Sequence, residues 1–216
     1  MERKVRQYEA EGIVVEFEVA RCIHAEECIH ALPKVFDAKA RPWIQPGNAS
    51  PDTIAEVVRR CPTGALHYRR ADSGAAEEPA VENTIRVMPD GPLYLAGRVR
   101  LYLTDGEVLE ETRVALCRCG DSKNKPFCDN THLERNFTDP GIAEEHRMGP
   151  KGDGADHALT VKLAPNGPIL VEGPLQVIAA DDVSAEGGKG AFCRCGSSGS
   201  KPYCDGAHAV AGFLSD

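Results

Sequence analysis

The sequence has no long apolar run, no excess of positive charge and few aromatic side chains. No apolar stretch approaches the about 18 residues that a membrane-spanning helix needs. The first residues, Met1-Glu2-Arg3-Lys4, are not followed by the apolar region of a signal peptide. The net charge is -8, which disfavours a nucleic-acid backbone as a partner and suits a basic protein better. We therefore expect neither a membrane span nor a nucleic-acid partner.

The sequence also lacks the motifs that indicate an enzyme. It shows no nucleophile–base pair at a recognised spacing, no phosphate-binding loop and no organic-cofactor motif. The segment Gly187-Gly188-Lys189-Gly190 lacks the spacing of a phosphate loop and is predicted to be an ordinary loop. Catalysis is not expected.

Nine cysteines are present, an odd number that a fully disulfide-bonded secreted protein would not normally carry. Together with the missing signal peptide, this number indicates reduced thiols in the cytoplasm, where they are available as metal ligands. The 21 glycines and 15 prolines suit small, turn-rich units that bound metal helps to stabilise.

One Cys-x-Cys-x8-Cys-x3-His frame occurs twice, with a constant offset of 76 residues. Its members are Cys117, Cys119, Cys128 and His132 in the first copy and Cys193, Cys195, Cys204 and His208 in the second. An arginine, a serine and an aspartate recur at the same offset, as Arg118/Arg194, Ser122/Ser198 and Asp129/Asp205. Six cysteines and two histidines held in one register indicate two metal sites.

The spacing predicts how the ligands pair. Residues at i and i+2 of an extended segment point to the same side, so the first two cysteines can hold one metal ion. A cysteine and a histidine four residues apart share one face of a helical turn and can hold a second ion. The following aspartate can cap that turn. On spacing alone, iron–sulfur is favoured over structural zinc, which also accepts three cysteines and one histidine but usually has two to four residues between paired cysteines, where this frame has one.

The segments CRCGDSKNKPFCDNTH (117–132) and CRCGSSGSKPYCDGAH (193–208) resemble the CDGSH iron–sulfur family, the mitoNEET-like or NEET proteins. The second copy matches the family motif throughout. The first departs from it once, with Asn130 at the glycine position, and asparagine tolerates positive φ better than most residues. The resemblance implies a [2Fe-2S] cluster in each repeat, with the histidine as the solvent-near ligand. It also implies two units packed about a two-fold axis, here within one chain, so that a monomer is expected.

A single imidazole ligand predicts a reduction potential above that of plant-type ferredoxins. Because the imidazole can exchange a proton, reduction should depend on pH and acid should labilise the cluster. Lys125 and Lys201 either tune this property or are solvated turn lysines. Arg118 and Arg194 are predicted to make structural hydrogen bonds.

A second kind of site is predicted near the N-terminus. Cys22, Cys28 and Cys61, the last followed by proline, match three of the four cysteines of a bacterial ferredoxin cluster, and Ala25 occupies the middle position. Residues 5–70 resemble the divergent single-cluster ferredoxin domain. That resemblance implies a [3Fe-4S] cluster, or a [4Fe-4S] cluster whose fourth ligand is His24 or an exogenous group. The alternatives are that His24 is no ligand and that the three cysteines pack as apolar side chains.

The order of elements predicts an α+β chain in five segments. Residues 1–70 form a small ferredoxin-like α+β domain and 71–83 a linker. Residues 84–137 and 160–213 form a mostly-β, NEET-like pseudo-dimer of tandem CDGSH repeats, joined by a surface connection over 138–159.

The N-terminal domain is predicted to contain two strands and two helices. The strands cover 11–19 and 65–68, and the first helix covers 26–32. Ser50 is predicted to cap the second helix, which carries Cys61 on its buried face.

Each repeat is predicted to open with two strands joined by an Asp-Gly or Asn-Gly turn. These strands cover 85–87 and 93–95 in the first repeat and 161–163 and 169–171 in the second, with a further strand at 99–103.

Electron transfer to a redox partner protein is the function that these features favour. The first alternative is delivery of a cluster to an acceptor protein, or sensing of redox state and pH. The second is a zinc-stapled interaction module without a redox role.

The N-terminal ligand assignment predicts the effect of Cys61→Ser. This substitution should abolish the EPR and visible absorption of the N-terminal cluster and leave both [2Fe-2S] spectra, because the serine removes one ligand from one site only. Unchanged N-terminal spectra would show that Cys61 is not a ligand.

Overall fold

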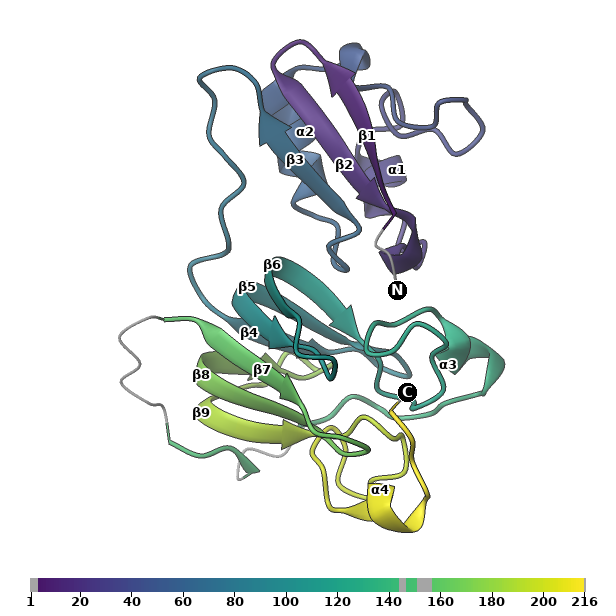
Figure 1. Ribbon diagram of the computed structural model, residues 1–216, viewed down its shortest axis with the longest axis vertical. Helices are drawn as coiled ribbons and strands as arrows, with labels where there is room; N and C mark the ends of the chain where they lie inside the picture. Colours follow the sequence, from purple (N-terminus) through teal and green to yellow (C-terminus); the bar gives the residue numbers. More distant parts are fainter. Residues whose placement is uncertain (1–3, 144–146, 151–156, 216) are drawn as a thin grey trace. The chain divides into compact units, whose positions relative to one another are not determined.

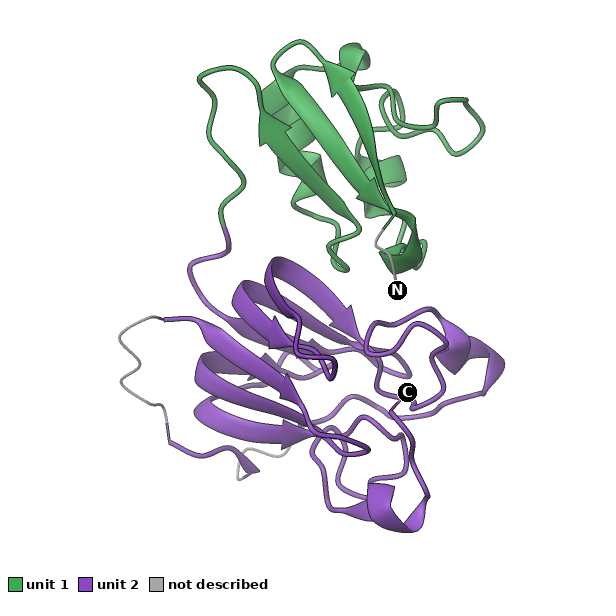
Figure 2. Ribbon diagram, in the orientation of Figure 1, with its two compact units in different colours: residues 1–78 green, residues 79–216 purple. Residues whose placement is uncertain are grey.

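The computed structural model describes residues 4–143, 147–150 and 157–215. The chain divides after Glu78 into two compact units, shown in different colours in Figure 2. The architecture is mixed α+β. Most residues in regular secondary structure belong to strands, and the helices are few and short. Among the described residues, no helix has the length and apolarity needed to cross a membrane.

The first unit is built on a three-stranded antiparallel sheet in the order β1-β2-β3 (Figure 1). The strands are β1 (Val5–Ala10), β2 (Ile13–Glu18) and β3 (Leu66–Arg70). β2 is central because its alternating apolar residues are buried, whereas β1 is mostly exposed and polar. β1 was not predicted, because its sequence does not alternate between apolar and polar residues.

Two short helices and two 3-10 turns complete the first unit. They are α1 (Glu27–Ala31), α2 (Pro51–Val58), η1 (Val19–Arg21) and η2 (Pro46–Asn48). The predicted cap of α2 is confirmed, since the Ser50 side chain accepts a hydrogen bond from Thr53 N at 3.3 Å.

The predicted extent of α2 was too long. The helix ends at Val58, and the N–H groups of Arg60 and Cys61 bond to the carbonyls of Val57 and Val58 in tighter turns. Cys61 therefore follows the helix instead of lying on its buried face.

The residues after β3 remain attached to the first unit. Glu77 accepts hydrogen bonds from Tyr68 N at 3.1 Å and contacts His67 Nδ1 at 3.0 Å. The Tyr68 hydroxyl donates to Ala76 O at 3.2 Å. Part of the segment 71–83, expected as a free linker, thus packs on β3.

In its described part, the second unit contains six strands and two single-turn helices (Figure 1). The first repeat supplies β4 (Thr84–Val87), β5 (Leu93–Tyr102), β6 (Val108–Leu116) and α3 (Thr131–Glu134). The second supplies β7 (Leu159–Leu163), β8 (Ile169–Ile178), β9 (Ser184–Phe192) and α4 (Ala207–Val210).

Strands of each repeat pair with strands of the other repeat. β4 pairs antiparallel with β5 of its own repeat and parallel with β8 of the other, whereas β7 pairs with β8 and β5. Thr84 lies opposite Gln176, and Arg100 lies opposite Thr160. These two pairings are related by the 76-residue offset of the repeats, so each repeat meets the other in the same register.

β5 and β8 are single strands, although the first repeat was predicted to have two separate strands here. Each carries a bulge, between Ala96 and Val99 in β5 and between Glu172 and Leu175 in β8. A glycine with positive φ lies in each bulge, because a side chain there would collide with the backbone of a neighbouring segment.

β6 and β9 were not predicted. β6 buries the charged residues Glu111 and Arg113, which breaks the apolar alternation. β9 contains the segment 187–190, which was predicted to be a loop, and this prediction was wrong. Pairing with β8 holds β9 in the extended conformation, which its glycines do not favour by themselves.

The connection over 138–159 lies partly outside the described residues. Asp139 is buried, Gly149 forms a bridge with Lys189, and Leu159 already belongs to β7. Most of the described residues of this segment are exposed or half-buried, and these three positions attach it to the rest of the second unit.

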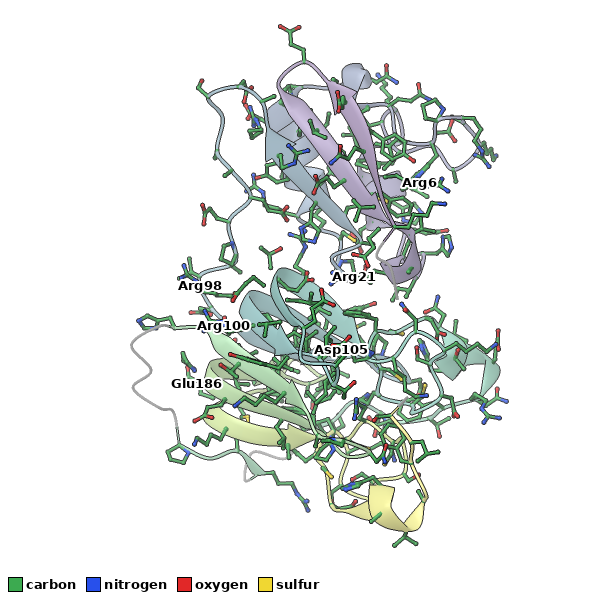
Figure 3. The ribbon with its side chains drawn as sticks, in the orientation of Figure 1. Arg6, Arg21, Arg98, Arg100, Asp105 and Glu186 are labelled. Atoms are coloured by element: carbon green, nitrogen blue, oxygen red, sulfur yellow. The ribbon has the colours of Figure 1, made fainter. Side chains whose placement is uncertain are left out.

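Charged side chains cover the outside of the second unit. Figure 3 labels Arg98 and Arg100 on β5, Asp105 in the turn that follows and Glu186 on β9. Arg100 Nε donates to Glu110 of β6 at 2.7 Å. Partly exposed pairs of this kind contribute little, so the stability of the unit depends on its core.

Each unit has a hydrophobic core of its own, and the two cores share no residue. We therefore expect residues 79–216, prepared anaerobically, to unfold cooperatively in urea when monitored by circular dichroism. A broad, non-cooperative transition would show that this unit needs the first one in order to fold.

Candidate metal centres

The first and third cysteines of each repeat lie on paired backbone segments. Cys117 N donates to Pro126 O at 2.8 Å, and Cys128 N donates to Ala115 O at 3.0 Å. In the second repeat, Cys193 N donates to Pro202 O and Cys204 N to Ala191 O, both at 2.8 Å. The end of β6 or β9 thus holds two ligands together through main-chain bonds alone.

The side chains form the pairs that the spacing predicts. Cys117 Sγ lies 3.6 Å from Cys119 Sγ, and Cys128 Sγ lies 3.5 Å from His132 Nδ1. The corresponding distances in the second repeat are 3.7 Å for its first two cysteines and 3.4 Å for its cysteine and histidine. Two ligands of one tetrahedral ion, bound at about 2.3 Å for sulfur and 2.0 Å for nitrogen, lie about 3.6 Å apart. Each pair is therefore spaced to hold one ion.

The two pairs of a repeat do not converge on a common ion. Within residues 4–143, 147–150 and 157–215, no three His, Cys, Asp or Glu side chains are placed to hold a single metal ion. Each repeat therefore offers two positions for metal, each with two protein ligands. A donor set of three thiols and one imidazole divided in this way fits an iron–sulfur cluster.

An aspartate organises the turn between the third cysteine and the histidine. Asp129 accepts hydrogen bonds from Lys123 N at 2.8 Å and Thr131 N at 3.0 Å, and Asp205 does the same with Gly199 N and Ala207 N. Burial opposes ionisation of Asp129, but these hydrogen bonds outweigh it and lower the pKa of the carboxyl group. The predicted capping role of both aspartates is confirmed.

The residue after each aspartate has a left-handed conformation. Asn130 has φ of 71° and Gly206 has φ of 90°. The asparagine of the first copy thus adopts the conformation that glycine adopts in the second, which explains why the substitution is tolerated.

The arginines between the paired cysteines are buried and bond to main chain. Arg118 donates to Gly91 O at 2.8 Å and to Met88 O, and it pairs with Asp139. Arg194 donates to Gly167 O at 3.0 Å and Ala164 O at 2.7 Å. Their predicted structural role is confirmed, and each arginine ties a cysteine loop to the turn before β5 or β8.

The two cysteine loops touch each other through glycines. A Cβ atom on Gly120 would lie 2.7 Å from Cys195 O, and one on Gly196 would lie 2.5 Å from Cys119 O. Both glycines have positive φ. The sequence showed that these glycines recur at the repeat offset, but only the fold shows that each meets the opposite repeat.

Burial raises the pKa of two of these thiols. It raises the pKa of Cys128 to about 11 and also raises that of Cys193. A hydrogen bond from the Cys119 thiol lowers the pKa of Cys117 to about 6 and raises that of Cys119 itself. Because metal ligands must be thiolates, metal binding displaces protons from the raised thiols.

The histidines differ between the repeats. His132 is buried, with 8 % of its surface exposed, and burial lowers its pKa. His208 is half-buried. The expectation of a solvent-near histidine therefore does not hold in the first repeat, because the surrounding side chains cover His132.

The two lysines also differ. Lys201 Nζ donates to Ser198 O at 2.6 Å, within its own loop. Lys125 lines an open pocket of about 410 Å³ together with Cys195, so it faces the opposite repeat.

The three N-terminal cysteines line a single small pocket. Its volume is about 30 Å³, and Cys22, Cys28 and Cys61 contribute to its wall together with Ala25. Burial, with the nearby Cys61 and Cys22, raises the pKa of Cys28 to about 11. The fold thus brings the predicted cysteines together and places an alanine where a fourth would lie.

His24 is not part of this pocket. Its side chain is exposed, and His30 is exposed as well and faces Glu26 at 3.6 Å. Thr63 Oγ1 instead lies 3.5 Å from Cys61 Sγ, a neighbour that the sequence did not single out.

Comparison with known proteins identifies relatives of both units. A family model described as "Divergent 4Fe-4S mono-cluster" matches residues 8–71. A model described as "Iron-binding zinc finger CDGSH type" matches residues 90–133 and 166–209. The "Uncharacterized protein YjdI" of Escherichia coli K12 and its counterpart in strain O157:H7 are each 41% identical over 64 residues, which cover 30% of this chain and 84% of the relative. No solved structure matches the chain significantly.

The contact between the cysteine loops predicts that Gly120→Ala destabilises the second unit. Gly106 is a matched control, because its φ of +90° is close to the +89° of Gly120 but no atom lies within 4 Å of its Cβ position. Both substitutions carry the strain of positive φ, and Gly120→Ala should cost about 1–3 kcal/mol more because of the overpacking. Urea denaturation measures the difference, and equal losses would show that the loops do not touch.

Proposed function

The chain belongs to the divergent 4Fe-4S mono-cluster family through residues 8–71 and to the CDGSH-type iron-binding family through its two repeats, and from this we propose that it is an electron-transfer protein. The resemblance inferred from the sequence is confirmed, and the chain is an iron–sulfur protein. We propose the type of each cluster, the number of clusters and their use in electron transfer.

We assign a [2Fe-2S] cluster to each repeat. The observation that carries this assignment is the division of four ligands into two pairs, each with a separation of 3.4–3.7 Å. A two-iron cluster needs two protein ligands on each iron, whereas a structural zinc ion needs all four ligands around one point. The ligand pairs therefore favour iron–sulfur over zinc.

We assign a [3Fe-4S] cluster to the N-terminal pocket. Three cysteines line the pocket, and Ala25 at the fourth position offers no ligand. A [4Fe-4S] cluster, which the family description names, would need a further ligand on its fourth iron. The absence of convergence on a single ion among the described residues suits either cluster, since each cysteine would bind a different iron.

The bound clusters would supply reversible one-electron transfer. The chain's own residues hold the thiol and imidazole ligands in place before metal arrives, through main-chain bonds at both ends of each cysteine loop. The buried Arg118 and Arg194 bond the loops to the turns before β5 and β8, which restricts movement of the ligands. Rigid sites of this kind favour electron transfer over turnover of a substrate.

We further propose that the protein is a monomer with an internal pseudo-two-fold. The reciprocal strand pairings and the reciprocal contacts of Gly120 and Gly196 support this proposal, because each repeat already covers the other. A reducing compartment such as the cytoplasm suits nine free cysteines. The net charge of -8 favours a redox partner with a basic surface.

The test is iron, sulfide and zinc analysis of anaerobically purified protein, with EPR spectra before and after dithionite. We expect about seven irons per chain, a [3Fe-4S] signal before reduction and [2Fe-2S] signals after it. Stoichiometric zinc without sulfide would replace electron transfer with a metal-stapled interaction module. Quantitative loss of clusters to an apo-ferredoxin, without fast reversible reduction, would establish cluster delivery.

A further inference from the structure

The candidate sites of the two repeats are not equally accessible. Cys119, Cys128 and His132 are buried, with 9 %, 4 % and 8 % of their surfaces exposed. Their counterparts Cys195, Cys204 and His208 are half-buried. The first cysteine is buried in both repeats, so the difference concerns the second cysteine, the third cysteine and the histidine.

The neighbouring side chains explain this difference. Around the first site, several positions carry longer side chains than their counterparts in the second repeat. The pairs are Asp121/Ser197, Lys123/Gly199, Asn130/Gly206, Thr131/Ala207, Leu133/Ala209 and Arg135/Ala211. The first repeat therefore carries larger side chains next to its ligands than the second repeat does.

Two of these residues join the cysteine loop to the residue after α3. Arg135 Nη2 lies 3.1 Å from Asp121 Oδ1. Both charges interact electrostatically with Cys119, so the ion pair lies next to this ligand of the first site. Ser197 and Ala211 stand at the equivalent positions and cannot form an ion pair. Both line the open pocket of about 410 Å³ that Cys195 also lines, and Asp121 of the first repeat contributes to the same wall.

We propose that the second repeat is the exchange site of the chain, and that the ion pair between Asp121 and Arg135 keeps the first site closed. This inference rests on the proposed function, because it assigns different roles to two metal sites with the same ligands. Molecules from solution reach Cys195 and Cys204 first, and the metal held by the first repeat is retained. Asp121 and Arg135 are positioning residues that act through the access they allow to Cys119.

The test measures the order in which the two sites lose metal. Full-length protein, as purified, is incubated with an iron chelator and N-ethylmaleimide, and each cysteine is followed over time by peptide mass spectrometry. A cysteine is alkylated only after its metal has left, so the modification reports each site separately. We expect Cys195 and Cys204 to be modified before Cys119 and Cys128.

Reciprocal variants test the role of the ion pair. The variant D121S/R135A should raise the modification rate of Cys119 by about two- to fivefold, the range that an exposed ion pair can control. The variant S197D/A211R should slow the modification of Cys195 by a similar factor. It also keeps the proposal testable if the first variant does not fold.

The variant R86A/D182S is a matched control. It removes an exposed ion pair of 2.9 Å in the same unit, between β4 and the turn before β9, and should leave the order and both rates unchanged. A change in the order or the rates with this control would overturn the specific role of Asp121 and Arg135. Equal modification rates at both sites in the unaltered protein, or no response to either reciprocal variant, would also overturn the inference.

Different results would contradict the proposed function and the assignment of the exchange site. Absence of iron and sulfide would refute the proposed function, whereas the order of cysteine modification would still be measurable with zinc in the sites. Two iron–sulfur clusters lost together at one rate would refute the inference and leave the proposed function intact.

Discussion

Main-chain pairing at the end of β6 and β9 is the constraint on which both CDGSH sites depend. It joins the segment before the first cysteine to the segment that carries the third, so ligands eleven residues apart meet without help from metal. The buried arginine, the serine and the aspartate of each frame then fix the loop between them.

The duplication makes the second unit self-sufficient. The first strand of each repeat pairs with a strand of the other, β4 with β8 and β7 with β5. The glycines of the two cysteine loops also meet across the repeat boundary. A single repeat would leave one side of β5 or β8 partly unpaired, because half of each strand pairs with the opposite repeat. The ligand frame is common to both copies, whereas the covering side chains differ, and this difference separates a closed site from an open one.

Much of both candidate sites could be predicted from the sequence, because the ligands are close neighbours along the chain. The pairing of Cys117 with Cys119 and of Cys128 with His132 follows from strand and helix periodicity. The left-handed turn at Asn130 and the cap at Ser50 follow from local backbone preferences. By contrast, β9 was predicted in part as a loop and β6 not at all, because glycines and buried charges hide strands whose order comes from their neighbours.

The sequence by itself determined the candidate ligands, the repeat and the family, because each depends on the spacing of residues along the chain. The structure decided that Cys61 lies beyond the helix and that His132 is buried while His208 is not. It also places the Cys22, Cys28 and Cys61 thiols, which the sequence predicted as ligands of one cluster, around one pocket. Burial depends on how segments far apart in the chain pack together, and the spacing of residues along the sequence does not contain that packing.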